Sequence, residues 1–190
     1  MANIRTFIAV EIPPSIQAVA ERQIEHLCRA GAEFRWVDPK KLHLTLRFLG
    51  NIRDTEVPEL CQVVQQAVSS MEAIMVSVQG LGAFPNLTHP KVIWMGMGEG
   101  KAELQQLQRQ VSVGLQKMGF PIESTEFRPH LTLGRIAGNN RMNDEVVEWI
   151  ERHHDTEFGG FEIDQVIVFS SFLDKDGTTH TPMATIELDG

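Results

Sequence analysis

The chain of 190 residues is 42% hydrophobic and 22% charged, with a formal net charge of −8 at pH 7. This composition is ordinary for a soluble globular protein, whereas the negative balance argues against broad nucleic-acid binding, which depends on lysines and arginines that contact phosphates. No apolar run is long enough to cross a bilayer, the first residues lack signal-peptide architecture, and two cysteines are too few for a disulfide framework. We therefore expect a cytoplasmic protein with no membrane partner, in which any anionic ligand binds a local basic pocket.

In chain order, the first half of the sequence predicts a strand, a helix, a strand, a helix and two further strands. Alternating apolar residues mark the first strand. Two prolines follow it, and proline is tolerated in the first turn of a helix. Apolar side chains at helical spacing mark both helices, and Gly31 ends the first. The predicted elements are a strand at 6–12, a helix opened by Pro13, a strand at 42–49, a helix from about 54 to 68, and strands at 74–83 and 91–97.

The second half predicts a helix at 101–117, a strand at 130–135, a helix at 143–153 and strands at 161–172 and 181–188. His26, His153 and His154 lie on or near predicted helices, and His89 and His180 lie in predicted loops. None of these five histidines has the spacing of a metal site, so we expect neither a metal nor any of them at a functional site.

The sequence contains an internal repeat. Residues 41–46, Lys-Leu-His-Leu-Thr-Leu, recur 87 residues later as Arg-Pro-His-Leu-Thr-Leu at 128–133. The same shift places Phe7 on Trp94 and 75–78 on 162–165, which extends the match to the order of the elements. We therefore expect one α+β domain over 1–190 with two similar lobes, repeated at about 1–97 and 91–190, with mostly antiparallel sheets facing a central cleft and helices outside.

The first motif strand divides into an apolar face and a polar face. Because alternate side chains of a strand point to opposite sides, His43, Thr45 and Arg47 are predicted to share the polar face. The apolar face is predicted to carry Leu42, Leu44, Leu46 and Phe48. In the second copy, His130 and Thr132 share a face, and strict alternation puts Arg135 on the opposite one.

Two lobes related by a pseudo-twofold axis would bring His43 and His130 together across the cleft. In-line displacement at phosphorus requires a base on one side and an acid on the other, and histidine suits both roles because its pKa is close to neutral pH. A threonine hydroxyl can donate to a phosphate oxygen, and an arginine can neutralise the phosphate charge. The pattern therefore indicates acid–base chemistry on a phosphate ester.

Several segments along the whole chain resemble the LigT-like RNA 2′,3′-cyclic phosphodiesterases of the two-histidine phosphoesterase superfamily. The residues that carry the resemblance are the two His-x-Thr motifs, Arg5-x-Phe-Ile-Ala9, Phe48-Leu-Gly50, Gly82-x-Phe-Pro85 and Pro90-x-Val-x-Trp94. The resemblance implies a bilobal fold with a central cleft, chemistry that needs no metal or cofactor, and a substrate that is an RNA or nucleotide with a 2′,3′-cyclic phosphate. The implied product is a 2′-phosphomonoester, formed by expulsion of the 3′-oxygen.

By the family pattern, His43 matches the proton donor and His130 the proton acceptor. Thr45 and Thr132 match the phosphate-binding hydroxyls, and Arg135 matches a position that often contacts phosphate. Further candidates for contacts with the base or the rest of the substrate are Phe7, Trp36, Arg47, Phe48 and Lys91. We expect the protein to act as a monomer.

Three alternatives stay open from the sequence. The same histidines would serve a 2′,5′-RNA ligase, or a phosphodiesterase for another small substrate such as ADP-ribose 1″,2″-cyclic phosphate or 2′,5′-oligoadenylate. A chain of another class would bind RNA ends without turning them over. The intact His and Thr in both motifs argue against this last alternative.

Overall fold

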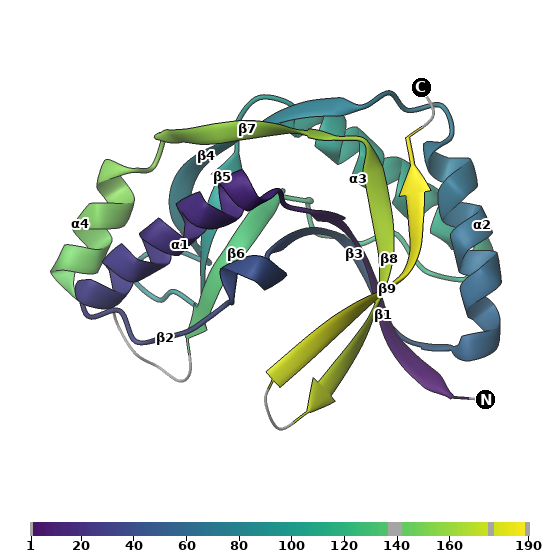
Figure 1. Ribbon diagram of the computed structural model, residues 1–190, viewed down its shortest axis with the longest axis horizontal. Helices are drawn as coiled ribbons and strands as arrows, with labels where there is room; N and C mark the ends of the chain where they lie inside the picture. The colour runs from purple at the N-terminus through teal and green to yellow at the C-terminus, as the bar shows by residue number, and fades with distance from the viewer. Residues whose placement is uncertain (1, 137–141, 175–176, 189–190) are drawn as a thin grey trace.

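The computed structural model describes residues 2–136, 142–174 and 177–188. Over these residues the chain forms two antiparallel sheets and four α-helices, which confirms the predicted α+β class (Figure 1). None of the described helices is long and apolar enough to span a membrane.

The sheets place the two motif strands in different layers. The first sheet has the strand order β3 (His43–Arg53), β1 (Asn3–Glu11), β8 (Gln165–Asp174) and β9 (Gly177–Glu187). The second has the order β2 (Phe34–Trp36), β6 (His130–Ile136), β5 (Val92–Met97), β4 (Ile74–Phe84) and β7 (Glu157–Ile163). All neighbouring strands are antiparallel, and β3 and β6 carry the two His-x-Thr motifs.

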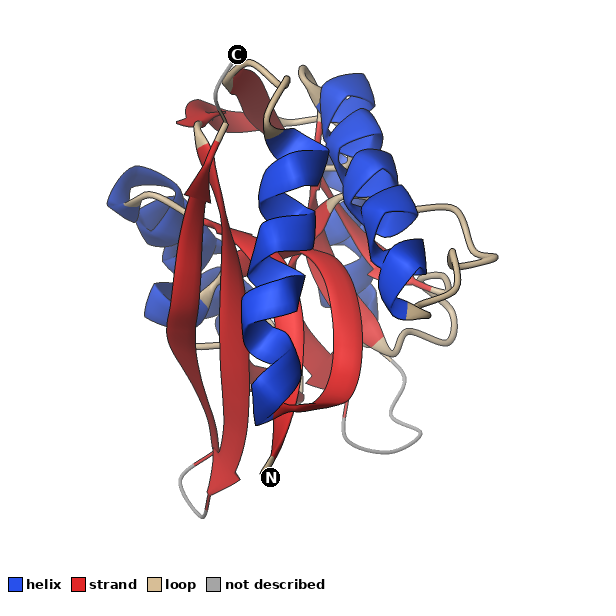
Figure 2. Cartoon of the chain, turned by 90° about the vertical axis from the view of Figure 1, so that its right-hand side faces the viewer, coloured by secondary structure: helices blue, strands red, loops and turns tan. Residues whose placement is uncertain are grey.

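Each sheet has a pair of helices on its outer side. On the second sheet, α1 (Pro14–Arg29) contacts β7 and α4 (Asp144–Arg152) contacts β4. On the first sheet, α2 (Val57–Val68) contacts β9, and α3 (Lys101–Leu115) packs on α2 and on β3. Figure 2 faces this second pair and shows two helices side by side in front of the strands. Both sheets therefore bury their outer faces and leave their inner faces to form the cleft.

The sheets do not coincide with the two halves of the sequence. The first sheet takes β1 and β3 from the first half and β8 and β9 from the end of the chain. The second takes β5, β6 and β7, but also β2 and β4 from the first half. The chain thus passes from one sheet to the other between β1 and β2, β2 and β3, β3 and β4, and β7 and β8. Each layer is completed by strands from both halves.

Two predicted strands differ from the structure, and one observed strand is absent from the prediction. The predicted strand at 161–172 is two strands of different sheets, β7 and β8, which separate at Asp164. The short strand β2 was not predicted, because a three-residue edge strand has no usable periodicity. The last strand begins at Gly177 rather than 181, so His180 lies in β9 and not in a loop.

The main hydrophobic core lies between the sheets and their helices, with α1 contributing Ile16, Ala20, Ile24 and Leu27 at helical spacing. A second cluster lies on the inner face of the first sheet and consists of Phe7, Ala9, Ile167 and Phe169. Phe7 and Phe169 stack with ring centroids 5.1 Å apart. This inner cluster forms the floor on which the residues of the first motif rest.

Candidate active site

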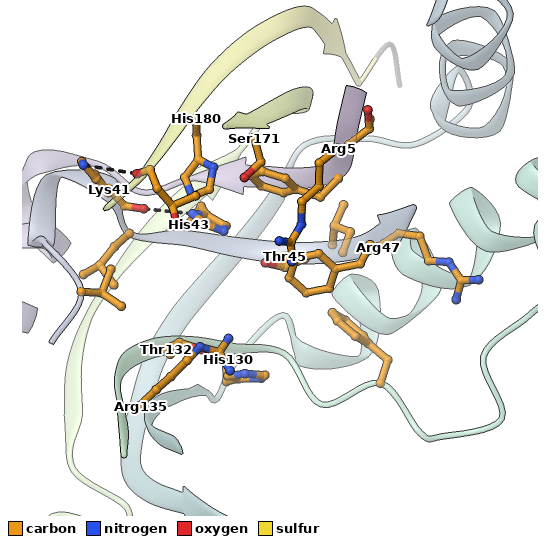
Figure 3. A pocket seen from close by; sticks show the side chains of 18 of the residues that line it. Arg5, Lys41, His43, Thr45, Arg47, His130, Thr132, Arg135, Ser171 and His180 are labelled. Atoms are coloured by element: carbon orange, nitrogen blue, oxygen red, sulfur yellow. Dashed lines mark hydrogen bonds between the residues drawn. The ribbon is translucent and has the colours of Figure 1, made fainter. Parts of the chain in front are cut away.

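A cleft of about 980 Å³ lies between the inner faces of the two sheets (Figure 3). Both motif strands line it, so the structure brings His43 and Thr45 of β3 into one cavity with His130 and Thr132 of β6. The predicted polar faces of the two motifs therefore meet the same space. Leu44 and Leu131, the residues between them, are fully buried on the other side.

The two histidines are fixed in the same way. Nδ1 of His43 lies 2.9 Å from the carbonyl oxygen of Lys41, and Nδ1 of His130 lies 2.6 Å from that of Arg128. A carbonyl can only accept, so each Nδ1 carries a proton and donates it to the oxygen two residues earlier. Lys41 and Arg128 are themselves 87 residues apart, like the histidines. The arrangement leaves Nε2 of each ring as the atom that can exchange a proton with a ligand.

Burial and a shared cation lower the pKa of both histidines. Desolvation is the main cause for His43 and for His130, and the positive charge of Arg135 adds to it in each case. The hydrogen bonds to the backbone carbonyls act in the opposite direction and only partly offset these effects. The lowered pKa favours the neutral form of each imidazole, while an anionic ligand would favour the charged form.

Each histidine also packs against an aromatic ring of its own sheet. The ring centroids of His43 and Phe7 are 5.0 Å apart, and those of His130 and Phe84 are 5.0 Å apart with the rings perpendicular. Phe7 is only 2% exposed, so it supports His43 from below. It has too little free surface to stack on a base, which corrects the expectation that it offers a stacking platform.

A β-bulge occurs at the same place in both motif strands. In β3, Ile8 pairs with Arg47 and Ala9 with Thr45, which leaves Leu46 without a partner. In β6, Ile93 pairs with Gly134 and Trp94 with Thr132, which leaves Leu133 without one. Leu46 and Leu133 are 87 residues apart, so the bulge belongs to the repeat. An extra residue in one strand reverses the alternation of the side chains that follow it.

This reversal corrects three predicted orientations. Arg135 lies in the cleft with His130, although strict alternation places it on the opposite face. Phe48 is 56% exposed and borders the cleft with its ring centroid 5.9 Å from that of Phe7, instead of joining the apolar face. Arg47 turns away from the histidines, as Figure 3 shows.

Arg47 has a structural contact outside the catalytic space. Its side chain is 6% exposed, and its guanidinium donates to the carbonyl oxygen of Pro121 and forms an ion pair of 2.9 Å with Glu123. Both partners belong to the segment that leads into β6. Although Arg47 borders the cleft, its charge is paired with Glu123. The contact connects the first motif strand to the segment that precedes the second motif strand.

Two other candidates have different positions. Trp36 lines the cleft, and its ring lies over Gly134, where an added Cβ would meet a ring carbon at 2.8 Å. Lys91 is exposed and is not among the residues that line the cleft, so it does not join the other candidates. Its backbone instead connects to Phe84 and Ile136.

The cleft contains further polar residues that the sequence did not single out for the site. On the side of the first sheet they include Arg5 of β1, Lys41 before β3, Ser171 of β8, and Thr178 and His180 of β9. On the other side, Glu126 and Arg128 precede the second motif. Figure 3 shows His180 and Ser171 above the first motif. Arg5 and Phe7 are two residues apart in β1, so alternation alone predicts that both side chains lie on the same face of the strand. His180 carries no such signal, because the sequence pattern predicts a loop at 180 and a strand only from 181.

Within the described part of the chain, no three His, Cys, Asp or Glu side chains come together as a metal site would require. The charge that acts on the pKa of both His43 and His130 is the cation Arg135. The arrangement can hold an anion between two imidazoles, with hydroxyls of Thr45 and Thr132 and the guanidinium of Arg135 around it.

The sequence is similar to known proteins along most of its length. The sequence model of the 2′-5′ RNA ligase superfamily matches residues 12–171. A protein of Methanothermobacter thermautotrophicus named RNA 2′,3′-cyclic phosphodiesterase is 31% identical over 186 residues, which cover 98% of this chain and 100% of that protein. A protein of Aquifex aeolicus with the same name is 31% identical and covers both chains completely.

Solved structures match the fold along its whole length. The Thermus thermophilus protein TT0787 has a TM-score of 0.81 at 23% identity, covering 98% of this chain and 99% of that one. Escherichia coli LigT complexed with 3′-AMP has a TM-score of 0.76 at 21% identity, with both chains fully covered. At these identities the likeness establishes the fold.

Proposed function

Because this chain belongs to the 2′-5′ RNA ligase superfamily, we propose that it is an RNA 2′,3′-cyclic phosphodiesterase, which hydrolyses the cyclic phosphate at an RNA end to a 2′-phosphomonoester. Full-length relatives with that name support the activity. The observation that carries the mechanism is the matched fixation of His43 and His130, each with Nδ1 on a backbone carbonyl and Nε2 left for the cleft.

In the proposed reaction the two imidazoles have opposite tasks. His130 is neutral and accepts a proton at Nε2 from water, whose oxygen forms a bond to phosphorus. The bond between phosphorus and the 3′-oxygen breaks, and His43, protonated at Nε2, gives its proton to that oxygen. The 2′-phosphate remains, and the two histidines have exchanged protonation states. Such a division of labour suits groups whose pKa is close to the working pH.

The phosphate is stabilised by the residues around the histidines. The hydroxyls of Thr45 and Thr132 donate to its non-bridging oxygens, and Arg135 neutralises its charge. The charge of Arg135 lowers the pKa of both histidines, which supports a position between them. The phosphate offsets this effect when it binds, and so allows His43 to be protonated when it is needed as an acid.

The exposed ring of Phe48 is the proposed contact for the nucleoside, with Trp36 on the opposite side of the cleft as a second one. Aromatic faces stack on bases with little preference among them. Arg47 and Lys91 have no place in this proposal, because one is bound to Glu123 and the other is not in the cleft.

We further propose that the chain is a single two-lobed domain, repeated at about 1–97 and 91–190, that acts as a cytoplasmic monomer. The shift of 87 residues, which relates the histidines, their carbonyl partners and the two bulges, supports the repeat. The two free cysteines, Cys28 and Cys61, are compatible with a reducing compartment.

The test is hydrolysis of a 2′,3′-cyclic nucleotide by the purified full-length chain in the presence of EDTA, with the product identified by chromatography. A variant with both histidines replaced by alanine controls for contaminating nucleases. Turnover to the 2′-phosphate supports the proposal. Binding without turnover would identify a protein that only recognises RNA ends. Activity that is lost with EDTA and restored by a divalent ion would refute acid–base catalysis by the histidines alone.

A further inference from the structure

We propose that His180 is a third substrate-contacting histidine of this cleft, which remains neutral and donates a hydrogen bond from Nε2 to an anionic oxygen on the His43 side. This inference rests on the proposed function, because it assigns a residue to the same reaction. The imidazole would hold the phosphate beside the proton donor without itself transferring a proton.

The position of His180 follows from the register of the hairpin formed by β8 and β9. His180 pairs with Ser171, and both side chains line the cleft. The ring of His180 is perpendicular to that of His43 at a centroid distance of 5.2 Å, and perpendicular to that of Phe7 at 4.9 Å. Figure 3 shows it directly above His43. A ligand bound at His43 therefore lies within reach of His180.

The hairpin is tied to the first motif. Nζ of Lys41 donates to the carbonyl oxygen of Thr178 at 3.3 Å, while the carbonyl oxygen of Lys41 accepts from His43. Lys41 thus connects β9, which carries His180, to the imidazole of His43, the proposed acid. This contact fixes the two imidazoles relative to each other, which is what a positioned hydrogen-bond donor requires.

The surroundings of the ring determine where its proton resides. Nδ1 of His180 is buried and has no hydrogen-bond partner among the described residues. A proton on this nitrogen would make it a buried donor without an acceptor, which costs free energy. An unprotonated Nδ1 without a partner costs less. The neutral ring therefore carries its single proton on Nε2. This tautomer is the opposite of that of His43 and His130, whose Nδ1 atoms are the donors.

Burial and the surrounding positive charges both lower the pKa of His180 and so favour its neutral form. Burial is the main cause that lowers the pKa of His180, and His43, Lys41 and Arg5 add positive charge from β3, from the segment before it and from β1. A second cation at this distance would also oppose protonation of His43. A neutral N–H donor avoids that repulsion and still offers a hydrogen bond to a phosphate oxygen.

Two substitutions separate the hydrogen bond from the shape of the ring. His180→Gln retains a neutral N–H donor of similar reach, and His180→Phe retains the ring that packs on Phe7 and His43 but removes the donor. His154, which is exposed at the end of α4, supplies matched controls as His154→Gln and His154→Phe. All four variants and the wild type are assayed on a 2′,3′-cyclic nucleotide across pH.

We expect His180→Phe to lower kcat/KM by about 10- to 100-fold, the range for a lost hydrogen bond to a charged group. His180→Gln should stay within about threefold of the wild type and keep both limbs of the pH profile, because His180 does not titrate in the reaction. The His154 controls should be unchanged. Equal loss in the two His180 variants, or none in His180→Phe, would overturn the proposal.

A second measurement does not depend on turnover. The ¹⁵N chemical shifts of the histidine side chains at neutral pH report the tautomers, and we expect protonation at Nε2 for His180 and at Nδ1 for His43 and His130. Binding of a nucleoside 2′-monophosphate should be weaker for His180→Phe than for His180→Gln. If the wild type does not hydrolyse the cyclic nucleotide, the proposed function fails, and these two results still decide the role of His180. A cationic His180, or its protonation at Nδ1, would contradict it.

Discussion

Phe48 and Arg135 occupy equivalent places in the two motif strands, since each follows an identical bulge and each turns its side chain into the cleft. One is apolar and 56% exposed, and the other is cationic. The two equivalent positions of the repeat therefore hold an aromatic residue in the first copy and a cationic residue in the second. This asymmetry gives the first sheet an apolar surface suited to a nucleoside and the second sheet a charge suited to a phosphate.

Arg135→Met should lower kcat/KM by about 10- to 100-fold, because it removes a charge-assisted hydrogen bond to the phosphate. Arg135→Lys should recover part of the loss, since a lysine supplies the charge but not the forked geometry. Steady-state kinetics on a 2′,3′-cyclic nucleotide measure both. Arg109→Met, on the exposed side of α3, is the control. If Arg135→Met behaved like that control, Arg135 would have no role in binding the phosphate.

Phe48→Ala should raise KM for a cyclic nucleotide by about 5- to 150-fold, the range for lost stacking of one base on an aromatic ring. It should have little effect on an abasic ribose 2′,3′-cyclic phosphate, which has nothing to stack. Phe172→Ala is a matched control, because Phe172 is 55% exposed but does not line the cleft. An equal effect of Phe48→Ala on both substrates would indicate that Phe48 orients the site rather than the base.

His43→Ala and His130→Ala should each lower kcat by about 10²- to 10⁴-fold, the usual contribution of a general acid or base. The double variant should lose far less than the product of the two losses, because the histidines act as a unit. Single-turnover assays remove the contribution of product release. Near-normal turnover in either folded variant would show that the assigned histidine does not transfer a proton.

Leu131→Ala should destabilise the protein by about 2–5 kcal/mol, since Leu131 is fully buried on the core side of the second motif strand. His130→Ala, one residue away on the cleft side, should leave the free energy of unfolding within about 1 kcal/mol of the wild type. Urea denaturation of the two variants compares these values. Comparable destabilisation by both changes would mean that the strand does not divide structural and chemical roles between its faces.

The pH dependence of kcat/KM should be a bell displaced to the acidic side of two ordinary imidazoles, because the pKa of His43 and of His130 is lowered in the free protein. The acidic limb reports protonation of the base, and the alkaline limb reports loss of the acid's proton. The profile of kcat should lie at higher pH, since a bound phosphate favours both imidazolium ions. A kcat profile at lower pH than that of kcat/KM would be inconsistent with an anion between the histidines.

The sequence was sufficient to predict that the histidines and threonines of both motifs face one cleft, because the motif is repeated and its residues precede the bulge. The sequence was insufficient to predict the face on which Arg47, Phe48 and Arg135 lie, because these residues follow the bulge. A bulge depends on how a strand pairs with its neighbour, and Leu46 and Leu133 are apolar residues that fit an ordinary strand equally well. Simple alternation therefore gave the wrong face for all three residues.

His180 was missed for a related reason. Its place in the cleft depends on the register that pairs β8 (Gln165–Asp174) with β9 (Gly177–Glu187). The local sequence near 177–180 has the threonines and glycine of a loop, so pattern alone favoured a later start of the strand. The pairing of β9 with β8 determines that the strand begins at Gly177.

The repeated passage of the chain between the two sheets has a consequence for motion. An enzyme whose cleft lies between independently folding units can open about a single hinge. Here a fragment ending near Gly98 would lack β6 beside β5, β7 beside β4 and β8 beside β1, so both walls would be left with unpaired edges. The walls must therefore fold and unfold together. Amide hydrogens of β1 and β5 should accordingly exchange with solvent through one common opening event, which native-state hydrogen exchange measures.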